Sequence, residues 1–180
     1  APGWVEPVDL EKVERDPVNG QVVQDKQVRI ESGRLWEYFD NVYRINSLQE
    51  MTQVGTFTAR WLPDKGDLIV HEIAILRDGE MVDVIAAGEE MEVLRREQLL
   101  ERQILDGSLT ATMSVPGLQI GDELRVRYSV TNSDQALGDE VQTQTMLWRE
   151  PNNLADFARV LVSWEDGLPV EYRAGPDFEL

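Results

Sequence analysis

The clearest pattern along the chain is a strict alternation of apolar and polar residues over positions 124–131. The apolar positions are Leu124, Val126, Tyr128 and Val130, and the polar positions are Arg125, Arg127, Ser129 and Thr131. Because successive side chains of a strand point to opposite faces, this alternation predicts an antiparallel strand with one apolar and one polar face. Leu109–Val115 alternates in the same way and predicts a second such strand.

Further segments have the composition of strands and are bounded by turn residues. They are Gln21–Ile30, Leu35–Ile45, Thr52–Trp61, Leu68–Arg77, Met81–Ile85, Gln142–Trp148 and a hairpin of Phe157–Trp164 with Pro169–Tyr172. Asp78 and Gly79 favour a tight hairpin turn, because both central residues of such a turn have positive φ. Many short strands separated by turns are typical of an antiparallel β-sandwich, so all-β is the fold class that we expect.

Two stretches depart from the strand pattern. Residues 89–105 are rich in Glu, Leu, Arg and Gln, which favours helix by propensity, but their apolar positions also fit two strand pieces around a polar turn. We expect a strand, a short helical segment and a strand there. Residues 1–19 contain Pro2, Pro7, Pro17 and many charges, which predicts an extended N-terminal arm. Residues 20–180 then form one sandwich domain, with no internal repeat.

Composition narrows the classes of function. The 180 residues include 17 Lys and Arg against 34 Asp and Glu, a net charge of -17. Such a surface repels phosphate backbones and anionic lipids, so we expect no nucleic acid partner. No apolar run approaches the roughly 20 residues that span a bilayer, so we expect no membrane insertion. The absence of cysteine excludes disulfides, thiol catalysis and thiolate metal sites.

His71 is the only histidine, and histidine is the usual base of nucleophilic catalysis. We expect it in mid-strand on the face of Ile69, Ile73 and Ile75, partly buried and satisfied by a hydrogen bond. Glu72 would then point to the opposite face, which argues against a histidine–carboxylate metal pair. We therefore expect no catalytic residue, no metal site and no cofactor.

The acidic excess keeps one enzymatic alternative open. In a carboxylate-based hydrolase, an acid pair would lie in a tryptophan-lined cleft. The acidic loop Ser133–Glu140 lacks the ligand spacing of an EF-hand, so a solvated turn is expected there rather than a calcium site. Most of the five tryptophans should fill the core. The candidate binding residues, for a peptide or a glycan, are Trp36, Trp61, Trp148 and His71.

A set of short motifs follows in order along the chain. They are Leu68–Ile73, Arg77–Glu80, Val93–Glu97, Gln103–Gly107, and Val115–Leu124 running into Arg125–Val130. This set resembles the domain of unknown function that precedes the transglutaminase-like core in exported bacterial proteins, over about residues 20–165. Within the last motif, Gly121 and Asp122 turn the chain into the alternating strand, which is a folding device rather than a reactive centre.

The resemblance implies a β-sandwich at the N-terminal end of a longer, exported or periplasmic polypeptide. The family's catalytic Cys, His and Asp belong to the following core and have no counterpart here, so the resemblance implies a chain that is not itself an enzyme. The expected function is that of an accessory or binding module. It would position a neighbouring transglutaminase-like core, or bind a peptide or glycan.

Overall fold

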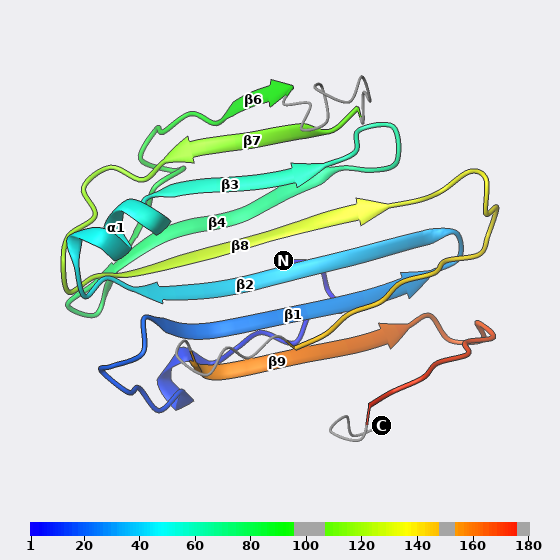
Figure 1. Ribbon diagram of the computed structural model, residues 1–180, viewed down its shortest axis with the longest axis horizontal. Coiled ribbons are helices and arrows are strands. Elements are labelled where there is room, and N and C mark those ends of the chain that lie inside the picture. The colour runs from blue at the N-terminus through cyan, green and yellow to red at the C-terminus, as the bar shows by residue number, and fades with distance from the viewer. Residues whose placement is uncertain (96–106, 148–153, 176–180) are drawn as a thin grey trace.

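The computed structural model describes residues 1–95, 107–147 and 154–175, and they form two β-sheets (Figure 1). The larger sheet has six strands in the spatial order β5 (Glu80–Asp83), β4 (Leu68–Arg77), β8 (Glu123–Asn132), β2 (Arg34–Arg44), β1 (Gln21–Glu31) and β9 (Ala155–Trp164). The smaller sheet has the order β3 (Thr56–Trp61), β7 (Leu109–Ser114) and β6 (Glu92–Arg95). The predicted all-β sandwich is confirmed.

The alternating segment forms β8, which lies inside the larger sheet between β4 and β2. Its residues Leu124 and Val126 are buried on the face that meets the smaller sheet, which we call the inner face. Arg125 and Arg127 project from the opposite, outer face, where they pair with carboxylates of neighbouring strands. The predicted division into an apolar and a polar face is therefore confirmed at β8.

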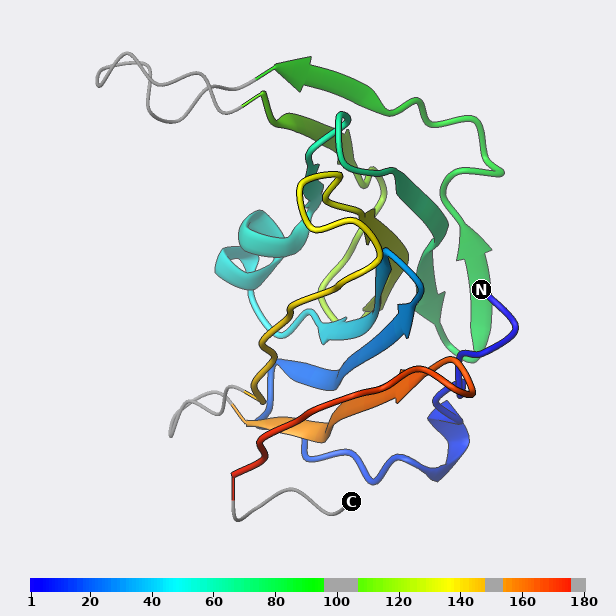
Figure 2. The ribbon, with the colours of Figure 1, turned by 90° about the vertical axis from the view of Figure 1, so that its right-hand side faces the viewer.

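The main core lies between the smaller sheet and part of the larger one. It joins side chains of β3 and β7 to side chains of β4 and β8, including Phe57, Ala59, Ala111, Met113, Ile73, Ile75, Leu124 and Val126. No residue of β1, β2 or β9 belongs to this cluster. The smaller sheet thus covers only the β4–β8 half of the inner face, and the view along the strands shows the larger sheet curving away below it (Figure 2).

A helix stands where the first half of a strand was predicted. Helix α1 (Leu48–Val54) precedes β3, which begins only at Thr56. Ser47 caps the helix by accepting a hydrogen bond from the Glu50 N–H at 3.2 Å. The Glu50 carboxylate in turn accepts one from the Asn46 N–H at 2.7 Å. This reciprocal cap, serine followed three residues later by glutamate, favours helix over the β-propensity of the segment.

Two further predictions about secondary structure and strand pairing are wrong at the connection from β8 to β9. Residues 142–147 form no strand, and Trp148 lies outside the described residues. β9 pairs with β1 in parallel, the exception to the expected antiparallel arrangement, so the chain must cross the sheet before β9 begins. Pro169–Tyr172 does not form the predicted hairpin strand either, although Tyr172 stacks on Trp164 with ring centroids 6.3 Å apart.

The predicted hairpin at Asp78 and Gly79 is confirmed. The Asp78-Gly79 hairpin joins β4 to β5, with φ of 51° and 83° at its two central residues. β6 confirms a strand over Glu92–Arg95, while residues 96–106, which include most of the expected helical segment, lie outside the described residues. Among the described residues, no helix has the length and hydrophobicity needed to cross a bilayer.

Candidate functional site

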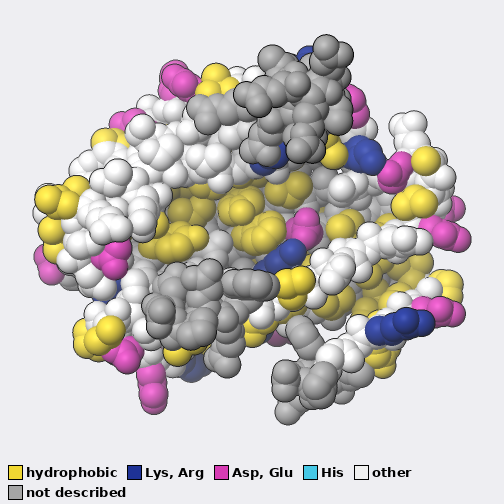
Figure 3. Space-filling view, viewed as in Figure 1, with side chains coloured by type: hydrophobic (Ala, Val, Ile, Leu, Met, Phe, Trp, Pro, Cys, Tyr) yellow, Lys and Arg dark blue, Asp and Glu magenta, His cyan; other side chains and the backbone are white. Residues whose placement is uncertain are grey.

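The inner face of the larger sheet is hollowed beyond the edge of the smaller sheet (Figure 3). Two adjoining depressions have volumes of about 430 and 310 Å³. Glu37 lines the larger one and Lys26 the smaller one, and the ion pair of these two side chains, 2.6 Å long, stands between them. We call the two depressions together the inner hollow.

Phe39 and Tyr43 line the smaller depression, and Phe39 belongs to a group of aromatic rings on the inner face. Phe39 stacks on Tyr128 with ring centroids 4.8 Å apart, and Phe57 meets Tyr128 edge-on at 5.6 Å. The Lys26 ammonium lies 5.4 Å from the centroid of Phe39, within the range of a cation–π interaction. Burial raises the pKa of Tyr128 to about 12 and also raises the pKa of Tyr43. Both phenols therefore stay neutral at physiological pH.

Amide side chains complete the lining of the smaller depression. Gln24 and Asn41 face each other across the β1–β2 ladder, and both line this depression beside Tyr43. An amide offers both a donor and an acceptor, so it can pair with either group of a peptide backbone. The inner hollow thus combines apolar surface with several polar side chains that can orient a ligand, and its charged groups are paired.

The structure separates the predicted tryptophans. Trp61 lines the larger depression and packs against the main core. Trp36 stands beside Thr131 and Arg29 on the outer face, and its indole N–H donates to Glu31 at 3.1 Å. Trp148 lies outside the described residues. Of the predicted binding residues, therefore, Trp61 alone is placed by the structure in the inner hollow.

His71 lies on the outer face, and the prediction of its face is wrong. A β-bulge between Val70 and Glu72 shifts the register of β4 against β8, so the alternation of faces is interrupted at His71. Its Nε2 is 2.8 Å from the Ser129 hydroxyl, and its ring lies 5.7 Å from that of Tyr38. The expected hydrogen bond is confirmed. Burial lowers the pKa of His71, and the positive charges of the amino terminus and Arg127 act in the same direction.

In its described lining each depression has one acidic residue, and that residue is paired with a cation. Glu37 is the carboxylate that lines the larger depression, and it is paired with Lys26. Asp25 borders the smaller one, but its carboxylate points to the outer face, where Arg159 pairs with it at 2.7 Å. A carboxylate-based hydrolase requires two carboxylates in one cleft. Neither depression has such a pair in its described lining.

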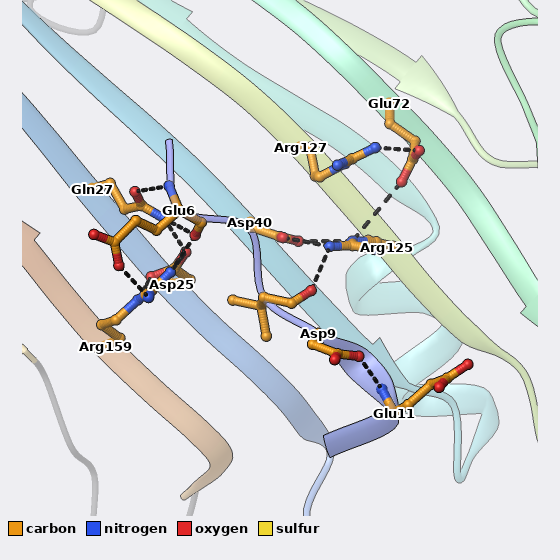
Figure 4. Close-up of polar contacts among 11 residues, drawn as sticks. Glu6, Asp9, Glu11, Asp25, Gln27, Asp40, Glu72, Arg125, Arg127 and Arg159 are labelled. Atoms are coloured by element: carbon orange, nitrogen blue, oxygen red, sulfur yellow. Dashed lines mark hydrogen bonds and ion pairs between the residues drawn. The ribbon is translucent and has the colours of Figure 1, made fainter. Parts of the chain in front are cut away.

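The outer face carries a row of charges that sequence reasoning did not find (Figure 4). Across β9, β1, β2, β8 and β4 the row consists of Arg159, Asp25, Asp40, Arg125 with Arg127, and Glu72. Asp40 accepts two hydrogen bonds from Arg125, at 2.6 and 3.0 Å. These hydrogen bonds raise the pKa of Arg125 although its burial opposes the charge. The charges of the row balance.

The N-terminal arm, residues 1–19, crosses this row of charges. The Glu6 backbone forms hydrogen bonds with the Gln27 side chain, and the Val8 carbonyl accepts one from Arg125 at 3.5 Å. The arm contains a 3₁₀ turn, Leu10–Lys12, and Val8 and Val13 are buried in a second apolar cluster. The arm is therefore a packed element. The sequence gives no distinct signal for Asp25 and Gln27, because β1 also carries Gln21, Gln24, Lys26 and Arg29.

The acidic loop shows no sign of a cation site. Asp134 forms an ion pair with Lys65 at 2.6 Å and accepts a hydrogen bond from the Ala136 N–H at 3.0 Å. Within the described parts of the chain, no group of three or more His, Asp or Glu side chains is arranged to hold a metal ion.

Comparison with solved structures supports the fold. A crystal structure from Parabacteroides distasonis ATCC 8503, described as a "putative protease", superimposes with a TM-score of 0.53 and 15% sequence identity. The match covers 63% of this chain but only 23% of that one. This chain thus spans less than a quarter of the length of that protein, and the likeness concerns the fold alone.

Comparison of the sequence with protein families identifies one family. No curated protein matches the chain. Residues 31–179 match a family described as "Domain of Unknown Function with solved-structure structure", DUF3857. This range covers β2 to β9, including the larger depression, part of the smaller one and most of the outer row of charges. The chain therefore belongs to the DUF3857 family.

Proposed function

We propose that this chain is a non-catalytic β-sandwich module that binds an extended, basic peptide in the inner hollow and thereby helps to position a neighbouring transglutaminase-like core. The observation that carries the proposal is the inner face of β1 and β2, which the smaller sheet leaves uncovered and beside which Met146 and Leu147 of the β8–β9 connection line the smaller depression. From Glu37 to Tyr43 this floor is about 20 Å long, at roughly 3.3 Å per strand residue. It suits an extended chain of about six residues.

The lining favours a peptide over a glycan. A sugar ring stacks on a free aromatic face, but Tyr128 stacks against Phe39 on one side of the ring and Lys26 lies over that same phenylalanine. In the smaller depression the lining open to a ligand consists of ring edges, the amides of Gln24 and Asn41, and the side chains of Met146 and Leu147. Apolar contacts with a few amide hydrogen bonds are the means by which proteins bind extended peptides.

The charge of the molecule favours a basic ligand. The chain carries a net charge of -17, while Lys26 and Glu37 neutralise each other in the middle of the inner hollow. The long-range field therefore attracts a cationic peptide, and the apolar floor binds its uncharged side chains. We expect this attraction to weaken as the salt concentration rises.

The non-catalytic part of the proposal rests on how the charged groups are used. Each carboxylate that lines a depression is paired with a cation, and His71 lies on the other face of the sheet. A side chain that acts as general acid or base must be free to exchange a proton with the substrate. The location of the module in an exported or periplasmic protein is supported by the sequence resemblance.

Peptide binding can be measured by fluorescence polarisation. The probe is a labelled decapeptide of alternating valine and lysine, and the control probe replaces lysine with glutamate. Asn41→Trp fills the smaller depression and should weaken binding of the basic peptide at least tenfold. Gln49→Trp adds the same bulk at an exposed position of α1 and should leave binding unchanged.

Gln24→Trp is the second variant that fills the depression, should Asn41→Trp fail to give a folded protein by circular dichroism. Equal affinity of the folded wild type and the folded variant for the basic peptide would overturn the proposal. So would a wild type that binds neither peptide, or one that binds a chitin oligosaccharide instead. The proposed neighbour is tested by sequencing the gene beyond codon 180, where we expect a domain with a catalytic Cys, His and Asp.

A further inference from the structure

The outer face holds the backbone of the N-terminal arm through a side-chain amide. The Glu6 N–H donates to Oε1 of Gln27 at 2.9 Å, and Nε2 of Gln27 donates to the Glu6 carbonyl at 2.7 Å. Gln27 is fully buried, and its Nε2 also donates to Asp25 at 2.7 Å. The amide is therefore held in one orientation, and it forms hydrogen bonds with both the N–H and the carbonyl of Glu6.

Two arginine side chains also donate hydrogen bonds to backbone carbonyls of the arm. Nη2 of Arg159 donates to the Glu6 carbonyl at 2.5 Å, and Nη1 lies 3.5 Å from the Glu6 carboxylate. Arg125 donates to the Val8 carbonyl at 3.5 Å. Both arginines are also fixed by buried aspartates, Asp25 and Asp40. The charged row thus presents oriented donors to the carbonyls of an extended segment.

An apolar contact anchors the segment beyond these hydrogen bonds. Val8 is 8% exposed and packs in a cluster with Val22, Val23 and Val42, against which Phe157 also lies. Glu6, by contrast, keeps 68% of its side chain exposed. The segment is thus held by backbone contacts at one residue, an acidic side chain near Arg159, and an aliphatic side chain two residues later.

The arm joins the sandwich through a short exposed turn. Asn19 donates to the Asp16 carbonyl at 3.1 Å across this turn, and Val18 is 84% exposed. β1 begins only at Gln21. Residues 1–13 can therefore lift from the outer face without breaking a strand ladder, while Arg15 and Asp16 keep the base of the arm bound to Glu123 and Asp156.

We propose that the outer face of β1, β8 and β9 is a docking site for an extended acidic peptide with an aliphatic residue two positions after its acid, and that the chain's own arm fills this site in cis. The site lies on the face of the sheet opposite the inner hollow, so the inference is independent of the proposed function. The arm then competes with any such peptide of a partner chain. A short tether gives it an effective concentration in the millimolar range.

The test adds the arm sequence in trans. The probe is a labelled synthetic peptide of residues 4–13, and the protein is the full chain carrying Val8→Asp, which removes the apolar anchor of the arm but leaves the site intact. Because the affinity for an added peptide falls with the fraction of open sites, this variant should bind the probe at least tenfold more tightly than the wild type. Gln49→Trp, at an exposed position of α1 away from both proposed sites, should change nothing.

A backbone change in the probe tests the site itself. Methylation of the Glu6 nitrogen removes the donor to Gln27 and should weaken binding at least tenfold. Methylation of the Val5 nitrogen is the matched control, because in the structure this N–H bonds to Pro2, outside the probe, and not to the outer face. Val8→Ala is the second variant should Val8→Asp not fold. A folded variant that binds the probe no better than wild type, or that binds both methylated probes equally, would overturn the inference.

Discussion

At the scale of single residues, Asp122 organises the turn that leads into β8. Its two oxygens accept hydrogen bonds from Nε and Nη2 of Arg77, both at 2.7 Å. The Gln119 N–H donates to the same carboxylate at 2.7 Å. Gly121 precedes it with φ of 100°, a conformation that glycine adopts readily. This carboxylate ties the end of β4 to the start of β8.

The pairing of Asp122 predicts a dependence of stability on pH. The hydrogen bond from Arg77 lowers the pKa of Asp122, although its burial acts in the opposite direction. A carboxyl whose pKa is lower in the folded state stabilises the fold above its unfolded pKa of about 4, and this contribution is lost as the pH falls through the folded value.

Asp122→Asn should therefore lower the melting temperature at pH 7. It should also flatten the fall of melting temperature below about pH 4. Melting curves followed by circular dichroism between pH 2 and 7 measure both effects. Asp64→Asn, at an exposed position, is the control. An acid dependence equal to that of the wild type would contradict the assignment.

At the scale of elements, the stability of α1 depends on its N-terminal cap, because the helix is short. The helix has seven residues, too few to be stable alone, and only Met51 and Val54 pack against the main core. The Ser47 hydroxyl satisfies the Glu50 N–H, and the Gly55 N–H returns to the Met51 carbonyl at 2.8 Å. Both ends of the helix therefore have partners for their backbone groups.

Removing the cap should destabilise the protein measurably. Ser47→Ala leaves the Glu50 N–H without its acceptor and should lower the free energy of unfolding by about 1 kcal/mol. Gln49→Ala, on the exposed side of the helix, should change it by less than about 0.5 kcal/mol. Urea denaturation compares the two. Equal effects of both substitutions would argue that the cap contributes nothing.

At the scale of the whole molecule, the outer row of charges links five strands. Asp25 and Asp40 stand directly opposite each other in the β1–β2 ladder, and each is fully buried on its side chain. Like charges in such positions destabilise a sheet unless cations compensate them. Arg159 from β9 and Arg125 from β8 supply that compensation. The row thus favours this order of strands over others.

A double-mutant cycle tests the coupling between β2 and β8. Arg125→Met leaves the buried Asp40 carboxylate without its cation and should lower the free energy of unfolding by about 3 kcal/mol. Adding Asp40→Leu removes the uncompensated charge, so the double variant should recover to within about 1 kcal/mol of the wild type. Chemical denaturation of the single and double variants gives the coupling energy. Additive losses would show that the two side chains act independently.

Local patterns along the chain were sufficient for β8, β7 and the Asp78-Gly79 hairpin. In each case the alternation of side chains or the φ requirement of two residues decides the element. They were not sufficient for α1, where the Ser47–Glu50 cap outweighs the β-forming residues that follow. At His71 a one-residue bulge reverses the predicted face, and nothing local to the sequence reports the register of a partner strand.

The sequence by itself determined the all-β class, the polar face of β8 and the absence of thiol chemistry, because these follow from side-chain period and composition. Only the tertiary structure decided that β9 lies parallel to β1, that the smaller sheet leaves half of the inner face uncovered, and that the arm covers the outer row of charges. These features depend on contacts between residues up to 153 positions apart, such as Glu6 and Arg159. Many pairings of the charged residues are compatible with one sequence, and packing selects among them.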